Sequence, residues 1–171
     1  MQPREQLPAG IVQTEVLKFT PESWNKVKKD ILRIEGECFG EEGYDEETFR
    51  KDFSKSSATI VLLRSSGLII GYTYALSVNV ERPLRWLERN ETALVASTAI
   101  TSDYQHRGLV RELIGKLEEE LKGKGFKFIE RDAAIANGYA DSIQRHYGRR
   151  IVESHDHKSK YGPQRFFRIR L

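Results

Sequence analysis

A short basic loop at residues 105–108, Gln-His-Arg-Gly, stands between an apolar segment and a helical pattern. Residues 93–100 form an apolar run, and turn-forming residues follow it. After the loop, apolar residues recur with helical spacing at Leu109, Val110, Leu113, Ile114, Leu117 and Leu121. The loop therefore lies at a helix N-terminus, where unpaired backbone N–H groups and the helix dipole attract negative charge. This strand, loop and helix predict an anion site that suits phosphate.

The spacing within the loop resembles a family signature. Gln105-x-x-Gly108-x-Val110 is similar to the Q/R-x-x-G-x-G/A motif of the GNAT superfamily of N-acetyltransferases, whose loop cradles the pyrophosphate of acetyl-coenzyme A (acetyl-CoA). The last position departs from the family, because Val110 stands where Gly or Ala is usual. By this resemblance, the expected cofactor contacts are Ile100, Thr101, Gln105, His106, Arg107, Gly108, Leu109, Val110 and Asn137.

A second part of the resemblance concerns the proton donor. The family pattern N-x-x-A-x-x-x-Y-x-x-x-G is matched by Asn137, Ala140 and Gly148. The family tyrosine often protonates the coenzyme thiolate, but Gln144 occupies its place, and glutamine cannot act as an acid. Tyr147 lies three residues further on a similar helix face and is the catalytic candidate, with core packing as the alternative; Tyr139 is a second candidate. Water could also supply the proton, because a thiol with a pKa of ~8.5 leaves readily.

Three carboxylates are candidates for the general base, namely Glu91, Glu130 and Asp132. Glu130 and Asp132 alternate with apolar residues on a predicted strand, and burial there would raise their pKa values. Pairing with Arg131 or exposure at the strand end is the alternative. His155 and His157 share one strand face, but two histidines do not complete a metal site, so no metal is predicted.

The elements that must position these residues follow from periodicity and turn signals. We expect helices at 21–40, 45–54, 109–122 and 138–147, and strands at 11–19, 58–63, 68–80, 93–100, 126–133, 150–158 and 165–171. Residues 64–67 suit a hairpin turn, and residues 81–92 a loop or one helical turn. The order β-α-α-β-β-β-α-β-α-β-β predicts an α/β fold with a mixed sheet and helices on both of its faces. By the resemblance, this sheet splays between residues 97–101 and 126–132, where the pantetheine arm lies.

Composition indicates one globular domain at residues 10–171, after a loose arm at residues 1–9. The 171 residues carry a formal net charge of +3, which by itself does not indicate nucleic acid. Cys38 is the only cysteine, which excludes an intrachain disulfide. The sequence shows neither a secretion signal nor a membrane span, so a cytoplasmic location is expected, without membrane partners.

The resemblance implies an acetyl-CoA-dependent N-acetyltransferase that moves the acetyl group directly to a primary amine of a small molecule or protein. Acidic residues crowd the first two helices and would favour a cationic acceptor or form a solvated face; they are Glu35, Glu37, Glu41, Glu42, Asp45, Glu46 and Glu47. One alternative is an acyl-CoA-binding module without turnover, which Val110 and Gln144 favour. Another is a nucleic-acid-binding domain that uses the basic C-terminal region, with Phe166 and Phe167 stacking on bases. The sequence leaves a homodimer open.

Overall fold

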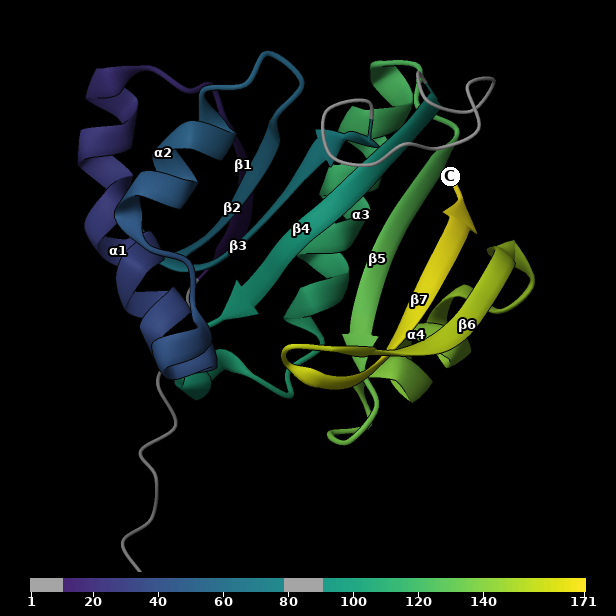
Figure 1. Ribbon diagram of the computed structural model, residues 1–171. Helices are drawn as coiled ribbons and strands as arrows, with labels where there is room; N and C mark the ends of the chain where they lie inside the picture. Colours follow the sequence, from purple (N-terminus) through teal and green to yellow (C-terminus); the bar gives the residue numbers. More distant parts are fainter. Residues whose placement is uncertain (1–10, 79–90) are drawn as a thin grey trace, which may run out of the picture.

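The computed structural model describes residues 11–78 and 91–171, which form one seven-stranded sheet with helices on both faces (Figure 1). The predicted arm at 1–9 and nearly all of the predicted loop at 81–92 lie outside the described residues. The strands are β1 (Val12–Leu17), β2 (Thr59–Ser65), β3 (Leu68–Ser77), β4 (Thr92–Ile100), β5 (Phe128–Ala134), β6 (Ile151–Ser159) and β7 (Gly162–Arg170). The predicted mixed α/β fold is confirmed.

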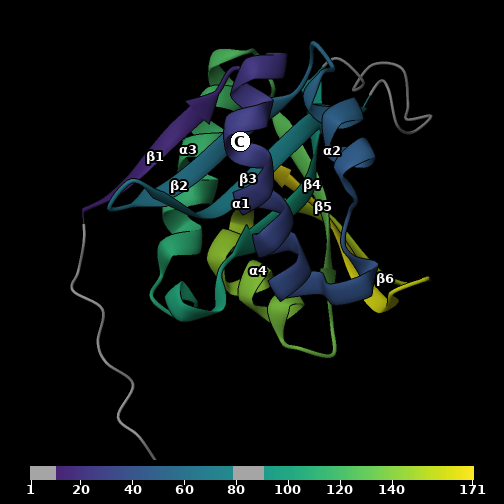
Figure 2. The same ribbon diagram turned by 90° about the vertical axis from the view of Figure 1, so that its left-hand side faces the viewer.

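Two pairs of helices enclose the sheet. Helices α1 (Pro21–Phe39) and α2 (Glu46–Phe53) pack on β2 and β3 (Figure 2), while α3 (Leu109–Gly123) and α4 (Tyr139–Tyr147) pack on the opposite face. Short 3-10 helices follow α1, β4 and α4; they are η1 (Gly40–Glu42), η4 (Ser102–Tyr104) and η5 (Gly148–Arg150). Each face therefore has its own hydrophobic core.

Local signals account for the helix starts. Thr20 and Ser23 form a reciprocal capping box before α1, with Pro21 at its first position. Asp45 caps α2 by accepting from the Thr48 N–H at 2.8 Å. Helix α3 begins after Gly108, whose φ of +78° is in the left-handed region that favours glycine. Along α3, Val110 does not share the buried face of Leu113, Ile114, Leu117 and Leu121, because its side chain is 40% exposed.

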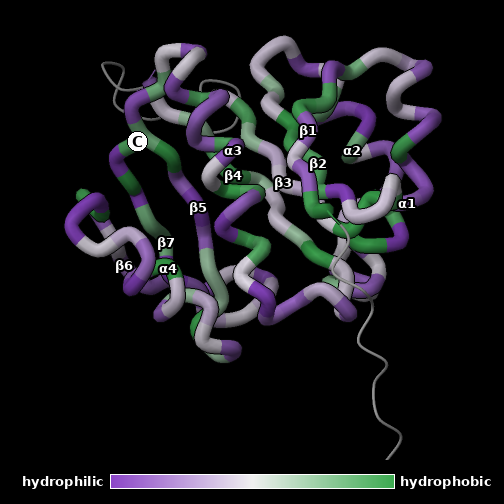
Figure 3. The backbone as a smooth tube through the Cα atoms, turned by 180° about the vertical axis from the view of Figure 1, so that it is seen from behind, coloured by the Kyte–Doolittle hydropathy of each residue, from purple (hydrophilic) through white to green (hydrophobic). Residues whose placement is uncertain are grey.

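Strand β3 is packed on both of its faces. Its residues from Ile69 to Leu76 are buried on both faces, because α1 and α2 cover one side and α3 the other. Strand β2, which pairs with it, is hydrophobic along most of its length (Figure 3). The turn between them needs only Ser66 and Gly67, both with positive φ, so Arg64 and Ser65 belong to β2. Likewise, Gly162 and Pro163 belong to β7 and not to a loop.

The sheet has the order β1-β2-β3-β4-β5-β7-β6, and among the described strands only β4 and β5 pair in parallel. That pairing covers just Thr92–Leu94 with Phe128–Glu130. A bulge then falls at Ala96, since Tyr74 pairs with Ser97 whereas Ala75 pairs with Val95. Beyond Leu94 the two strands diverge (Figure 1), so residues 95–100 have no ladder with β5. We call this region the β4–β5 split.

Gly71 lies where the end of β4 meets β3 and α3. A Cβ atom at Gly71 would lie 2.9 Å from both the Ala99 carbonyl oxygen and Ile100 Cγ1, and 3.3 Å from Leu113 Cδ1. Gly71→Ala should therefore push the end of β4 away and lower the free energy of unfolding by about 1–3 kcal/mol, measured by urea denaturation. Gly115→Ala on α3, where a Cβ meets nothing within 4 Å, is the control and should not destabilise. Equal stability of both variants would contradict this packing.

Candidate functional site

The candidate site lies where β4 and β5 end, because both strands run to the same edge of the sheet and α3 and α4 begin beyond it (Figure 1). At the split, Ala96, Ser97 and Thr98 are partly exposed. Backbone groups on an unpaired strand edge require other partners. An extended ligand arm with amide groups could supply them.

The loop between β4 and α3 has the form of an anion site. His106 and Gly108 both have left-handed backbones, which turn the chain into the first residue of α3. Gly108 gives no side-chain cap, and the Arg111 N–H donates to the Gly108 carbonyl oxygen at 3.1 Å, so the N–H groups of Leu109 and Val110 are the first-turn amides that remain for a ligand. A Cβ atom at Gly108 would meet nothing within 4 Å, so there is open space at this position. His106 and Arg107 are exposed beside them, and the Arg107 guanidinium lies 5.1 Å from the centre of the Tyr104 ring.

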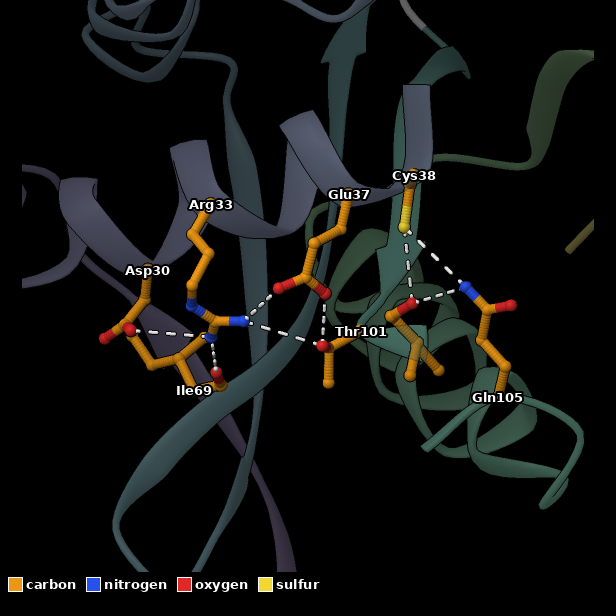
Figure 4. A network of polar contacts seen from close by, with 8 residues as sticks. Asp30, Arg33, Glu37, Cys38, Ile69, Thr101 and Gln105 are labelled. Carbon is orange, nitrogen blue, oxygen red and sulfur yellow. Dashed lines mark hydrogen bonds and ion pairs between the residues drawn. The ribbon is translucent and has the colours of Figure 1, made fainter. Parts of the chain in front are cut away.

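Gln105 turns back from this loop. Its Nε2 donates to the Ile100 carbonyl oxygen at 2.8 Å and lies 3.8 Å from Cys38 Sγ, while the Cys38 thiol donates to the same carbonyl at 3.3 Å (Figure 4). Gln105 thus fastens the loop to the end of β4. Burial raises the pKa of the Cys38 thiol, so the thiol stays a donor.

The end of α1 also contacts Thr101, the residue that follows β4. The Thr101 hydroxyl donates to Glu37, which also pairs with Arg33 at 2.8 Å (Figure 4). These hydrogen bonds from Thr101 and then Arg33 lower the pKa of the Glu37 carboxyl. Arg33 in turn donates to the Ile69 carbonyl oxygen at 3.2 Å, which connects α1 to β3. The predicted contacts Ile100 and Thr101 are therefore held by α1.

Glu35 is a buried carboxylate that the sequence did not single out, because it was counted with the acidic surface. Its side chain is 3% exposed, accepts from the Tyr44 N–H at 2.8 Å and accepts from the Tyr72 hydroxyl. Burial raises the pKa of Glu35. The Tyr72 oxygen also lies 3.2 Å from Ser97 Oγ at the split. The available signal was spacing, since Glu35 follows Ile31 by four residues on the inward face of α1.

The three predicted base candidates each contact a basic residue. Glu130 is 1% exposed and pairs with Arg168 at 3.3 Å, so the alternative of exposure at the strand end does not hold for it. Glu91 pairs with Lys127 at 2.6 Å. Asp132 lies 2.8 Å from His157 Nε2.

The two histidines do share a strand face, with ring centres 6.2 Å apart. His155 stacks on Phe166 at 4.9 Å, and His157 contacts Asp132. Within residues 11–78 and 91–171, no group of three His, Cys, Asp or Glu side chains could hold a metal ion. No helix of that same part of the chain is long and apolar enough to cross a membrane.

The tyrosine candidates lie on α4. Tyr147 is 3% exposed in the core, where burial raises its pKa and the Arg150 guanidinium lies 5.2 Å from the centre of its ring. Tyr139 accepts from Arg131. Asn137 accepts from the Tyr139 N–H at 3.0 Å, which leaves its amide N–H groups for a ligand. The burial of Tyr147 favours the packing alternative, and its catalytic role stays a prediction.

The basic C-terminal region does not form the stacking surface that a nucleic-acid-binding domain would need. Phe166 and Phe167 are buried. Three of its arginines are in ion pairs, namely Arg150 with Glu118, Arg165 with Asp156 and Arg168 with Glu130. This arrangement removes the sequence-based support for that alternative.

The split mixed sheet, with a helix N-terminus at its opening, has the architecture that the resemblance implies. The family model described as "Acetyltransferase (GNAT) family" matches residues 24–142, more than half of the chain, and the chain therefore belongs to this family. The resemblance inferred from residues 105–110 is thus confirmed at the level of the family. A comparison with curated proteins gave no significant match.

Solved structures share the fold. The ribosomal-protein-S18-alanine N-acetyltransferase from Escherichia coli is 16% identical, with 93% of each chain covered and a TM-score of 0.65. An aminoglycoside acetyltransferase from an uncultured soil metagenomic sample, in complex with sisomicin, is 18% identical, with 79% of this chain and 86% of that chain covered and a TM-score of 0.62. A GNAT family acetyltransferase from Elizabethkingia anophelis with acetyl-CoA bound is 12% identical, with 94% and 98% covered and a TM-score of 0.60.

Glu35 and Glu37 should have opposite effects on the pH dependence of stability. The pKa of Glu35 is raised on folding, so its contribution is full at low pH and is lost as pH rises through the folded pKa. The pKa of Glu37 is lowered, so its contribution is present at neutral pH and is lost as pH falls through the folded pKa. As pH rises from 4 to 8, Glu35→Gln should gain stability relative to the unmodified protein, and Glu37→Gln should lose it.

Thermal unfolding of the three proteins across this pH range checks the prediction, with the difference in Tm as the readout. Because each variant is compared with the unmodified protein at the same pH, other titrating groups cancel to first order. Parallel Tm differences for the two variants would contradict the assigned environments.

Proposed function

We propose that the protein is an acetyl-CoA-dependent N-acetyltransferase that moves the acetyl group directly to a primary amine. One observation carries the proposal: residues 95–100 of β4, which have no ladder with β5, are followed by a short loop and then by the N-terminus of α3, which has no side-chain cap. This arrangement suits a ligand that has an extended amide-bearing arm and a diphosphate.

The residues present fit such a donor. The first-turn amides of α3, with His106 and Arg107, would hold the diphosphate, and Gln105 would keep their loop in place. Residues 95–100 of β4 would pair with the pantetheine arm, and the Asn137 amide would donate to it. Acetyl-CoA would supply the acyl group as a thioester.

The acceptor class is narrowed by the acidic end of α1. Of the seven carboxylates expected there, Glu35 is buried, Glu37 pairs with Arg33, Asp45 caps α2 and Glu46 pairs with Lys28. Glu41 and Glu42 of η1 are exposed, next to the loop that covers Glu35. Two of the three solved structures named above have amine-containing acceptors or ligands, an S18 alanine and an aminoglycoside. A cationic amine therefore fits best.

Calorimetry and a thiol-release assay test the proposal. Acetyl-CoA at a hundredfold excess over its Kd should stabilise the fold by about 2.7 kcal/mol. Thiol should then be released when a polyamine, an aminoglycoside or a lysine peptide is added. Binding without release for every amine would favour the alternative of a binding module, which Gln144 supports by replacing the family's tyrosine. Absence of binding at millimolar acetyl-CoA would overturn the proposal.

Gly108→Glu should weaken acetyl-CoA binding at least tenfold, because its carboxylate would repel the diphosphate at the start of α3. Gly108→Ala is the matched control, since it imposes the same strain at a φ of +78° without a charge, and a Cβ there has open space. Calorimetric Kd values separate the two effects. An unchanged Kd for the Glu variant would contradict the placement of the diphosphate.

A further inference from the structure

A series of hydrogen-bonded side chains connects the buried Glu35 carboxylate on α1 to Ser97, in the part of β4 that has no ladder with β5. We propose that Ser97, Tyr72 and Glu35 form a relay that accepts the proton of the acceptor amine during acyl transfer; this inference rests on the proposed function. These three side chains lie on the sheet face that α1 covers. Helix α3 covers the opposite face (Figure 2).

Of the three side chains, Ser97 is partly exposed and Tyr72 and Glu35 are buried. Ser97 follows the bulge of β4, within the β4–β5 split. Its Oγ lies 3.2 Å from the Tyr72 oxygen, and Tyr72 donates to Glu35. Tyr72 is 0% exposed. A proton received at Ser97 can therefore reach Glu35 through hydrogen bonds alone.

The contacts of Glu35 suit a carboxylate that gains a proton better than they suit one that stays charged in an ion pair. Burying a carboxylate is costly, and its contacts here are a backbone N–H and a phenol, which are neutral donors. The nearby pair of Tyr74 and Asp52 differs. Tyr74 donates to Asp52 at 2.9 Å, but Asp52 also pairs with Lys55 at 2.8 Å, so its charge is neutralised. Burial raises the pKa of the Glu35 carboxyl, which favours its gaining a proton.

The loop after η1 is built around this carboxylate. A Cβ atom on Gly43 would lie 2.9 Å from Glu35 Cγ, so only glycine lets the loop pass this closely. The next residue, Tyr44, then gives its N–H to Glu35. The titratable groups that face Glu35 are Tyr72 from β3 and Cys38 from the next turn of α1, both neutral near pH 7 because burial raises their pKa values.

The proton count closes. The neutral amine nitrogen forms a bond with the acyl carbon of the thioester, and the carbon–sulfur bond breaks, with its electron pair leaving on the thiolate. The amine proton passes to Ser97 Oγ, the Ser97 hydroxyl proton to the Tyr72 oxygen, and the Tyr72 proton to the Glu35 carboxylate. Both hydroxyls end as they began, and Glu35 gains one proton, which it then loses to solvent.

The test compares two tyrosine–carboxylate pairs of the same face. Tyr72→Phe and Glu35→Gln interrupt the relay, whereas Tyr74→Phe and Asp52→Asn make the same chemical changes in the pair that does not contact Ser97. Each variant is assayed for kcat/KM towards the amine from pH 5 to 9, and for acetyl-CoA Kd by calorimetry. General base catalysis typically contributes 10²–10⁴-fold.

We expect Tyr72→Phe and Glu35→Gln to lower kcat/KM at least about a hundredfold with unchanged Kd, and Glu35→Gln to lose the acid limb of the pH profile. The pair at Tyr74 and Asp52 should keep both the rate and the profile. Equal kcat/KM values and pH profiles in all four variants would overturn the relay. A lowered kcat/KM for Tyr72→Phe together with an unchanged kcat/KM for Glu35→Gln would overturn it as well. Lack of turnover by the unmodified protein with every amine would instead reject the proposed function.

Discussion

The divergence of β4 from β5 after Leu94 is the constraint on which the site depends. A strand inside a sheet normally has ladder partners on both sides, and residues 95–100 of β4 lack one on the β5 side. Strand β3 still pairs with them on the other side, across the bulge at Ala96. The end of α1 also contacts the end of β4, through Cys38 at Ile100 and Glu37 at Thr101. The open edge is thus held in place by β3 and by side chains of α1.

Helix α1 changes its role along its length. Its first turns bury Trp24, Val27 and Ile31 against the sheet, which is ordinary amphipathic packing. Its last turns present polar groups to the same face, and Glu35 is the most deeply buried of these. Each of those groups has a hydrogen-bond partner. The last turns of α1 therefore bury less apolar surface than the first turns, and their hydrogen bonds fix polar groups near β4.

The sequence predicted what local rules control. The Thr20 cap and the Asp45 cap are signals within a few residues of the helices they start, and the helices were found there. Burial of both faces of β3 was not predictable, because it depends on which helices cover the sheet. The contacts of the site join distant residues: Tyr72 and Glu35 are 37 apart, and His157 and Asp132 are 25 apart. Only the strand register and the helix placement bring them together.

The missing family tyrosine at Gln144 fits a site whose main task is to remove a proton from the acceptor. A lysine-like acceptor loses two protons on the way to the amide. The first makes the neutral amine, at a cost of about 4.6 kcal/mol at pH 7 for a pKa of ~10.4, and the second leaves during acyl transfer, whereas a thiolate with a pKa of ~8.5 leaves unprotonated for about 2 kcal/mol. The larger cost falls on the acceptor side. A buried carboxylate reached through Tyr72 acts on that side, so the chain can lack an acid on α4 and still meet the greater demand of the reaction.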